Sequence, residues 1–207
     1  MKFTKKDLKR LSNVIKYRRD VRGNNFVSKK ISKKDIKSII EAGLDAPSVG
    51  YSQPWYFVVI ENKKIKKKVY KNFKKEYKDS KKYFKSRPLY NSLKLEGIKE
   101  TPINIAVYYK KDKNKTLGAT SQKNMQKYSV VCAIQNMWLM ARVLNIGIGW
   151  VSILKPKKVN KILGLTKDYK LIGYLCVGYT KKFCKLPELQ KLHWAKEKLY
   201  KDVVEYV

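Results

Sequence analysis

Residues 130–154, VVCAIQNMWLMARVLNIGIGWVSIL, decide the fold of this 207-residue chain. The first part, residues 130–144, is apolar on every side of a helix and has no charge before Arg142, which predicts a long, central and buried helix. The second part, residues 147–154, is a short apolar run with two glycines, which predicts a buried strand. The elements on either side of this pair set the fold class.

Apolar runs outside this stretch predict three more strands, and helical spacing predicts four more helices. The strands are expected at residues 55–60, 103–109 and 171–179, and the helices at residues 5–16, 33–46, 65–77 and 156–163. This order predicts an α+β fold, an α/β sandwich with a central mixed β-sheet flanked by helices. No G-x-G-x-x-G motif follows a strand, which disfavours a Rossmann unit.

The chain is expected to form a single domain over residues 1–207, because it has no internal repeat and no flexible linker. Its apolar content of 43% and aromatic content of 12% are too high for a disordered chain. Residues 78–97 have weak helical periodicity and contain Pro88. They are predicted to form a mobile segment or lid.

Composition also disfavours several functional classes. The chain has no run of about 18 apolar residues and no apolar segment within residues 1–10, which predicts a cytoplasmic protein without a membrane span. Its three cysteines, Cys132, Cys176 and Cys184, have no C-x-x-C spacing and are expected to be buried free thiols. His193 is the only histidine, which argues against a zinc site and a Ser-His-Asp triad, so no metal is expected.

The net charge of +33 has two interpretations. Clustered lysine and arginine can neutralise nucleic-acid phosphates. Here the excess is almost all lysine, is spread along the whole chain and accompanies no nucleic-acid motif, so a general surface bias is favoured. In either case the basic field should attract phosphorylated small molecules.

Three short motifs are each weak on their own. Arg18-Arg19-Asp20-Val21-Arg22 offers guanidinium groups for a phosphate, with Arg18 and Arg22 on one face if the preceding helix continues, or it is a solvated helix end. The strand at residues 147–152 is an ordinary buried strand, or its glycines let a planar ligand approach the backbone. Pro47-Ser48-Val49-Gly50 offers a third surface of backbone and hydroxyl groups.

Together, these motifs resemble the nitroreductase-like flavoprotein superfamily and, more narrowly, the 5,6-dimethylbenzimidazole synthase family. Generic nitroreductases tend to carry Arg-Arg-Ser at the first motif, so Asp20 is the discriminating residue. The resemblance spans residues 17–194 and continues through residues 128–136, 174–178 and 187–189. It departs from the family at Ala119, where an arginine is expected after Leu117-Gly118, and in the lysine-rich residues 61–94.

The resemblance implies an enzyme that consumes reduced FMN together with molecular oxygen, giving 5,6-dimethylbenzimidazole, the lower ligand of cobalamin, and a four-carbon sugar phosphate. It further implies a homodimer with the flavin between its subunits and a separate flavin reductase as the donor, with no nucleic acid or membrane as partner. Asp20 and Ser152 are the implied catalytic residues. The implied flavin contacts are Arg18 and Arg22 at the phosphate, Arg19 near the ring or ribityl chain, Pro47, Ser48, Val49, Gly50 and Gln53 at the isoalloxazine, and Asp20, Val21, Trp150, Val151 and Ser152.

Two other functions stay open at this point. The chain could be an FMN-dependent NAD(P)H nitroreductase or flavin reductase, which recycles its flavin, or a basic nucleic-acid-binding protein. Asp20 also has a purely structural interpretation, a salt bridge to a neighbouring arginine. Because arginines flank it, its carboxylate is expected to be ionised at neutral pH.

Overall fold

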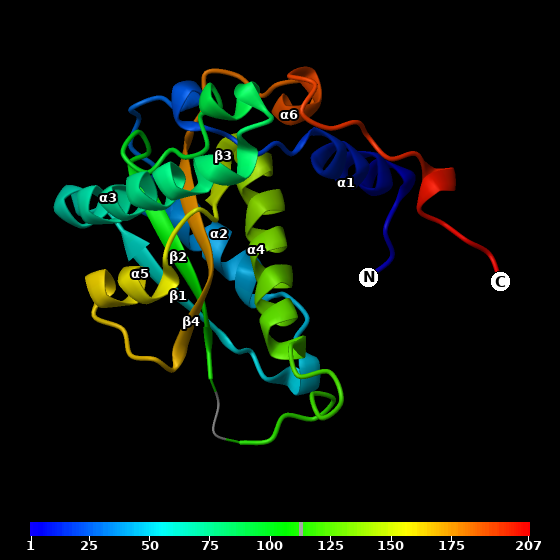
Figure 1. Ribbon diagram of the computed structural model, residues 1–207. Coiled ribbons are helices and arrows are strands. Elements are labelled where there is room, and N and C mark those ends of the chain that lie inside the picture. The colour runs from blue at the N-terminus through cyan, green and yellow to red at the C-terminus, as the bar shows by residue number, and fades with distance from the viewer. Residues whose placement is uncertain (112–113) are drawn as a thin grey trace.

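The computed structural model describes residues 1–111 and 114–207 and has a single four-stranded sheet between two layers of helices (Figure 1). The strands are arranged in the order β1-β2-β4-β3, and every adjacent pair is antiparallel. The strands are β1 (Trp55–Ile60), β2 (Ile103–Lys110), β3 (Ile146–Val151) and β4 (Tyr169–Tyr179). The predicted α+β class is confirmed. Among the described residues, parallel pairing is limited to an isolated bridge between Asp20 and Ile148, so the sheet is mixed only at its β3 edge.

The helices cover the two faces of the sheet in pairs. Helices α2 (Lys33–Leu44) and α4 (Met125–Val143) pack on one face, and α3 (Lys63–Ser80) and α5 (Pro156–Leu163) pack on the other. Local chemistry sets several of these boundaries. The Ser32 hydroxyl accepts a hydrogen bond from the Asp35 N–H at the start of α2, and α5 begins at Pro156 and ends before Gly164 in the left-handed conformation.

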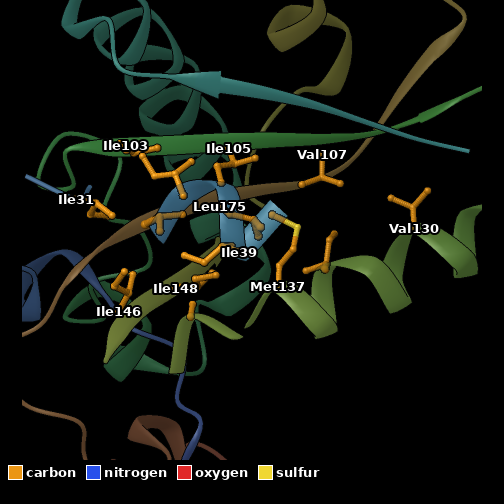
Figure 2. Packing of buried hydrophobic residues seen from close by; sticks show 14 residues of the cluster. Ile31, Ile39, Ile103, Ile105, Val107, Val130, Met137, Ile146, Ile148 and Leu175 are labelled. Carbon is orange, nitrogen blue, oxygen red and sulfur yellow. The ribbon is translucent and has the colours of Figure 1, made fainter. Parts of the chain in front are cut away.

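The central strands are buried on both faces, which explains why their sequences are almost continuously apolar. Ile105 and Val107 of β2 point toward α2 and α4, while Ala106 and Tyr108 point toward α3 and α5. Figure 2 shows the first of these two cores, in which side chains from β2, β3 and β4 meet Ile39 and Met137 from the helices.

Helix α4 differs from the prediction in its start and in its burial. It begins at Met125, five residues before the predicted start, and only one of its faces contacts the rest of the chain. Tyr128, Val131 and Val143 are exposed on the other face, as is Cys132. In a single chain, the helix is therefore not fully buried and Cys132 is exposed, so both predictions are wrong. Hydrophobic periodicity shows that a helix is apolar on every side, but it does not predict which part of the protein covers each face.

Helix α1 (Lys5–Tyr17) and the C-terminal segment lie at the periphery. No residue of α1 is buried, and Leu8, Leu11 and Ile15 are exposed. The C-terminal segment contains only the short helices α6 (Glu188–Lys191) and η5 (Tyr200–Asp202), and it leaves the body beside α1 (Figure 1). No described helix has the length and apolar character that crossing a membrane requires.

The segment predicted as a lid begins within α3, which runs on to Ser80, and continues through η3 (Lys81–Phe84) and η4 (Pro88–Asn91). Tyr90 is buried, and its ring stacks on Phe84 at 4.2 Å. Both rings contact Trp194 of the C-terminal segment, and the Arg87 guanidinium lies 3.4 Å from the centre of the Trp194 ring. Aromatic packing therefore holds this segment against the C-terminal segment.

Candidate functional site

The motif at residues 18–22 leaves α1 and runs alongside strand β3. The Val21 N–H donates to the Ile148 carbonyl at 3.0 Å, and the Asp20 carboxylate accepts from the Trp150 N–H at 3.1 Å. The fold therefore brings two of the three sequence motifs into direct contact, although about 130 residues separate them.

Gly149 makes this contact possible. A Cβ atom at position 149 would lie 2.1 Å from the Val21 carbonyl oxygen, far inside van der Waals contact. At Gly147, a Cβ atom would meet only the Val21 side chain, at 2.8 Å. Gly149 therefore lets the backbone of a neighbouring protein segment approach closely, where one of the two sequence interpretations had placed a planar ligand.

Arg22 points inward. Its guanidinium forms an ion pair with Asp20 and donates to the carbonyls of Leu95 at 3.0 Å and Trp150 at 3.2 Å. The alternative interpretation of Asp20, a salt bridge to a neighbouring arginine, is thus realised in the structure. Arg22 also ties Asp20 to the end of the predicted lid.

Arg18 and Arg19 have different surroundings. Helix α1 ends at Tyr17, and Arg18 is extended, so Arg18 and Arg22 do not share a helical face. The Arg18 guanidinium lies over the Trp138 ring at 4.7 Å. Arg19 donates to the carbonyls of its neighbours and of Lys185, and its Nε is buried with no hydrogen-bond partner. An unsatisfied buried donor of this kind is a position where a ligand acceptor would be stabilising.

A cavity of about 180 Å³, which we call the arginine cavity, opens beside these residues. Five basic and two acidic side chains line it, namely Arg18, Arg19, Arg22, Lys94, Lys182, Asp20 and Glu188. This balance suits an anionic group such as a phosphate. The volume is below the roughly 300–1,000 Å³ of pockets that enclose a whole small-molecule ligand. The cavity of one chain can therefore enclose only part of a mononucleotide.

Burial affects the pKa of the Asp20 carboxyl more than the neighbouring arginines do. It raises the pKa of Asp20 above the usual value, while Arg22, the Trp150 N–H and Arg18 act in the opposite direction. Burial therefore outweighs the flanking arginines in setting the direction of this shift, and the expectation that the carboxylate is ionised at neutral pH stays a prediction. A carboxyl with a raised pKa, held beside a cationic cavity, is suited to exchange a proton.

The third motif forms a loop around η2 (Val49–Tyr51). The Ser129 hydroxyl accepts from the Val49 N–H, and the Ser48 hydroxyl accepts from the Gln53 N–H, both at 3.1 Å. Gly50 has φ 53°, and a Cβ there would lie 2.6 Å from the Leu117 carbonyl oxygen. Pro47, Gly50 and Gln53 are exposed, whereas the Ser52 hydroxyl is buried without a partner.

This loop lies at the opposite end of α4 from the arginine motif (Figure 1). Ser129 anchors the loop, whereas Trp138 and Arg142 donate to the carbonyls of Arg19 and Tyr17. Nine to thirteen residues of helix separate these contacts, or about 14–20 Å at 1.5 Å per residue. None of the loop residues lines the arginine cavity. One chain therefore brings Arg18–Arg22 and Trp150 together but leaves the loop apart from them.

Ser152 lies just beyond β3, which ends at Val151 and not at the predicted Leu154. It is exposed and does not line the arginine cavity, and neither do Trp150 and Val151. Ala119 lies close to the loop, because its neighbours Leu117 and Gly118 pack against Gly50 and Val49. The arginine that the family pattern expects after Gly118 would thus lie beside the loop at residues 47–53, which we call the loop half of the site; residues 18–22 form its arginine half.

Sequence reasoning assigned no site role to ten of the lining residues of the cavity, among them Lys94, Leu95, Lys182 and Glu188. Lys182 follows β4, and Glu188 belongs to the short stretch at residues 187–189 that carried part of the resemblance. Their positions depend on the C-terminal segment returning to the arginine motif, where the Thr180 hydroxyl donates to the Asn25 carbonyl. No local sequence pattern predicts that the C-terminal segment lies beside the arginine motif.

Comparison with known proteins shows the family and the fold of the chain. Residues 15–179 match the family described as the Nitroreductase family. The chain is 32% identical over 188 residues to 5,6-dimethylbenzimidazole synthase of Rhodospirillum rubrum, covering 89% of this chain and 88% of that protein. It is 30% identical to the protein of the same name from Rhodobacter capsulatus, covering 94% and 95% of the two chains. Among solved structures, oxidised iodotyrosine deiodinase bound to FMN and 3-iodo-L-tyrosine superposes with a TM-score of 0.72 at 19% identity, over 95% of this chain and 98% of that one.

Proposed function

The chain belongs to the nitroreductase family, and we propose that it is a 5,6-dimethylbenzimidazole synthase that fragments reduced FMN with oxygen. The observation that carries this proposal is the placement of Asp20. Its carboxylate is held by Arg22 and the Trp150 N–H at the wall of a cationic cavity, where a generic nitroreductase is expected to have a serine. The two relatives of that name match nearly the whole chain. Reduced FMN is expected to come from a separate flavin reductase.

The residues present suit FMN. The excess of basic side chains and the unpaired Arg19 Nε are suited to hold the phosphate and ribityl oxygens. When bound, reduced FMN supplies both the electrons for oxygen and the atoms of the benzimidazole. Asp20 then has the role of accepting a proton from the ribityl chain, and Arg22 has the role of orienting the Asp20 carboxylate.

We further propose that residues 78–97 close over the flavin within a single domain. The end of this segment supplies Leu93, Lys94 and Leu95 to the cavity wall. Arg22 binds the Leu95 carbonyl, so the segment and the Asp20 carboxylate share one guanidinium.

The active form is proposed to be a homodimer, because one chain does not place its loop at its own arginine cavity. The exposed apolar face of α4 and the unburied side of α1 are surfaces that a second copy would cover. A two-fold partner can present its residues 47–53 to the cavity of the first chain, which would complete a site larger than 180 Å³.

Mixing two inactive variants tests the shared site. Asp20→Asn damages the arginine half, and Gly50→Val damages the loop half, because φ 53° and the Leu117 carbonyl exclude a branched side chain. A mixed dimer has one site with both halves intact, so random reassociation should restore about a quarter of wild-type activity. Each variant mixed with itself is the control. No recovery, with mixed dimers verified by mass spectrometry, would contradict a site shared between chains.

Removal of Arg18 or Arg22 should weaken binding of reduced FMN by one to two decades, since a charged hydrogen bond contributes ~1.5–3 kcal/mol. Lys157→Ala, a surface lysine outside the cavity, is the control and should change affinity little. Anaerobic titration gives the dissociation constants. Riboflavin, which lacks the phosphate, should bind poorly to the wild-type protein, and equal affinity for riboflavin and FMN would contradict the proposed contact of Arg18 and Arg22 with the phosphate.

Ser152→Ala should leave the fold unchanged, because Ser152 is exposed and the change in volume is small. If the hydroxyl is aimed at the flavin ring in the dimer, product formation should slow by more than flavin binding weakens. Single-turnover rates and binding constants separate the two effects. Unchanged kinetics would make Ser152 a structural residue.

A further inference from the structure

A second hollow lies away from the arginine cavity, between α3 and the segments at residues 28–30 and 99–102. Its volume is about 900 Å³, and eight lysines and two glutamates line it. Four of the lysines come from successive turns of one face of α3, namely Lys63, Lys67, Lys71 and Lys74. No residue of this hollow belongs to the proposed flavin site.

Lys66 distinguishes this hollow from an ordinary lysine-rich surface. It lines the hollow but is only 4% exposed, and its ammonium donates to the carbonyls of Thr101 at 2.7 Å and Pro102 at 3.1 Å. No carboxylate in residues 1–111 and 114–207 forms an ion pair with it. Burial lowers the pKa of Lys66, so the protein holds a poorly compensated cation at this position.

Two glutamates against eight lysines neutralise the hollow only in part, and Glu61 partly offsets the charge of Lys66. Glu100 is bound by Lys94 at 3.1 Å, a lysine that lines the other cavity. Glu61 is exposed. At the rim, the Lys99 ammonium lies over the Tyr70 ring at 4.3 Å, which adds another cation to the opening. An incoming anion would therefore meet a concentrated positive field with a buried ammonium beneath it.

We propose that this hollow binds a compact polyphosphate chain, either free or carried by a nucleoside triphosphate. Lysines suit this ligand because each is a flexible point charge that can follow successive phosphates. A polyphosphate chain carries several charges on a compact group and matches the eight clustered lysines, whereas the phosphates of a nucleic acid carry single charges and are flanked by sugars on both sides. The proposal is independent of the flavin chemistry.

Calorimetric titration with inorganic tripolyphosphate at about 0.15 M salt tests the proposal, because surface electrostatics are screened there. The site variant is Lys67→Gln with Lys71→Gln, and the control is Lys157→Gln with Lys158→Gln on α5, which removes the same charge outside the hollow. We expect one tripolyphosphate per chain, at least about tenfold weaker binding for the site variant, and less than about twofold for the control. Tripolyphosphate should also protect Lys67 and Lys71, but not Lys157 and Lys158, from acetylation.

ATP in place of tripolyphosphate distinguishes the two sources. Tighter binding of ATP assigns the hollow to nucleotides, and equal binding assigns it to the phosphate chain alone; both support the proposal. Equal losses of affinity in the site variant and the control variant would overturn the proposal, because they would show that binding depends on the overall positive charge of the protein. Displacement of tripolyphosphate by FMN would place it in the arginine cavity, and tighter binding of duplex DNA with a steep salt dependence would make this a nucleic-acid surface. Either of these last results would also overturn the proposal.

Discussion

Asp20→Asn should bind reduced FMN like the wild-type protein, allow oxygen to oxidise it, and form 5,6-dimethylbenzimidazole about 10²–10⁴-fold more slowly, the usual contribution of a positioned proton acceptor. Asparagine keeps the size of the side chain and can still accept from the Trp150 N–H. It cannot take a proton. Wild-type protein given reduced FMN under air should yield the benzimidazole without added nicotinamide nucleotide, and it should yield none without oxygen. Mass analysis of the products measures both results.

The pH dependence gives the same experiment a second readout. Burial raises the pKa of Asp20, and the base is present only above that pKa, so the rate should rise with pH through a midpoint above the usual aspartate value. Arg22→Ala should move the midpoint further upward, because the Arg22 charge lowers this pKa. In terms of stability, the raised pKa favours the folded state at low pH, and that contribution is lost as pH rises through the folded pKa.

Two outcomes would contradict the role of Asp20. If the wild-type protein returns intact oxidised flavin under air, the chain is a flavin-recycling member of its family. If Asp20→Asn forms the benzimidazole at the wild-type rate, the proton acceptor is another residue. The proposal of a site shared between subunits would survive the second outcome, because it depends on placement and not on the base, but its mixing test would then need a different inactive variant of the 18–22 segment.

Gly149→Ala should destabilise the protein by about 3 kcal/mol or more, at or above the upper end for overpacked cores, and should abolish flavin binding. The added methyl group would lie 2.1 Å from the Val21 carbonyl, and neither backbone can rotate away. Relief requires the 18–22 segment to leave β3, which breaks the hydrogen bond between Val21 and Ile148 and displaces Asp20. Denaturant unfolding and anaerobic flavin titration measure the two effects.

Gly147→Ala is the matched control, because its methyl group would meet only side-chain atoms of Val21 among its three nearest neighbours: a rotation can relieve the contact with a methyl group at 2.8 Å, and a small shift can relieve the contact with the Cβ at 3.2 Å. It should cost clearly less stability and retain flavin binding. Equal effects of the two substitutions would contradict a special role for the backbone contact between Gly149 and Val21.

The sequence alone determined the elements of this fold and its family. Strand β1 and helix α5 begin and end at the predicted residues, Trp55–Ile60 and Pro156–Leu163, because apolar runs, a proline at a helix start and a glycine at a helix end act locally. The three motifs identified the family even though their geometry was unknown, and the matching family confirms that identification.

Only the tertiary structure decided which motifs meet. Asp20 contacts Trp150 across about 130 residues, Arg22 turns inward to Leu95, and the loop at residues 47–53 lies at the far end of α4. Periodicity also could not predict the exposed face of α4, because the sequence of a helix that is apolar on every side does not show which neighbouring element covers each side. Capping and periodicity are properties of a few consecutive residues, whereas burial, pKa and the completeness of a site depend on surfaces that meet only after the chain, and then a second chain, has folded against them.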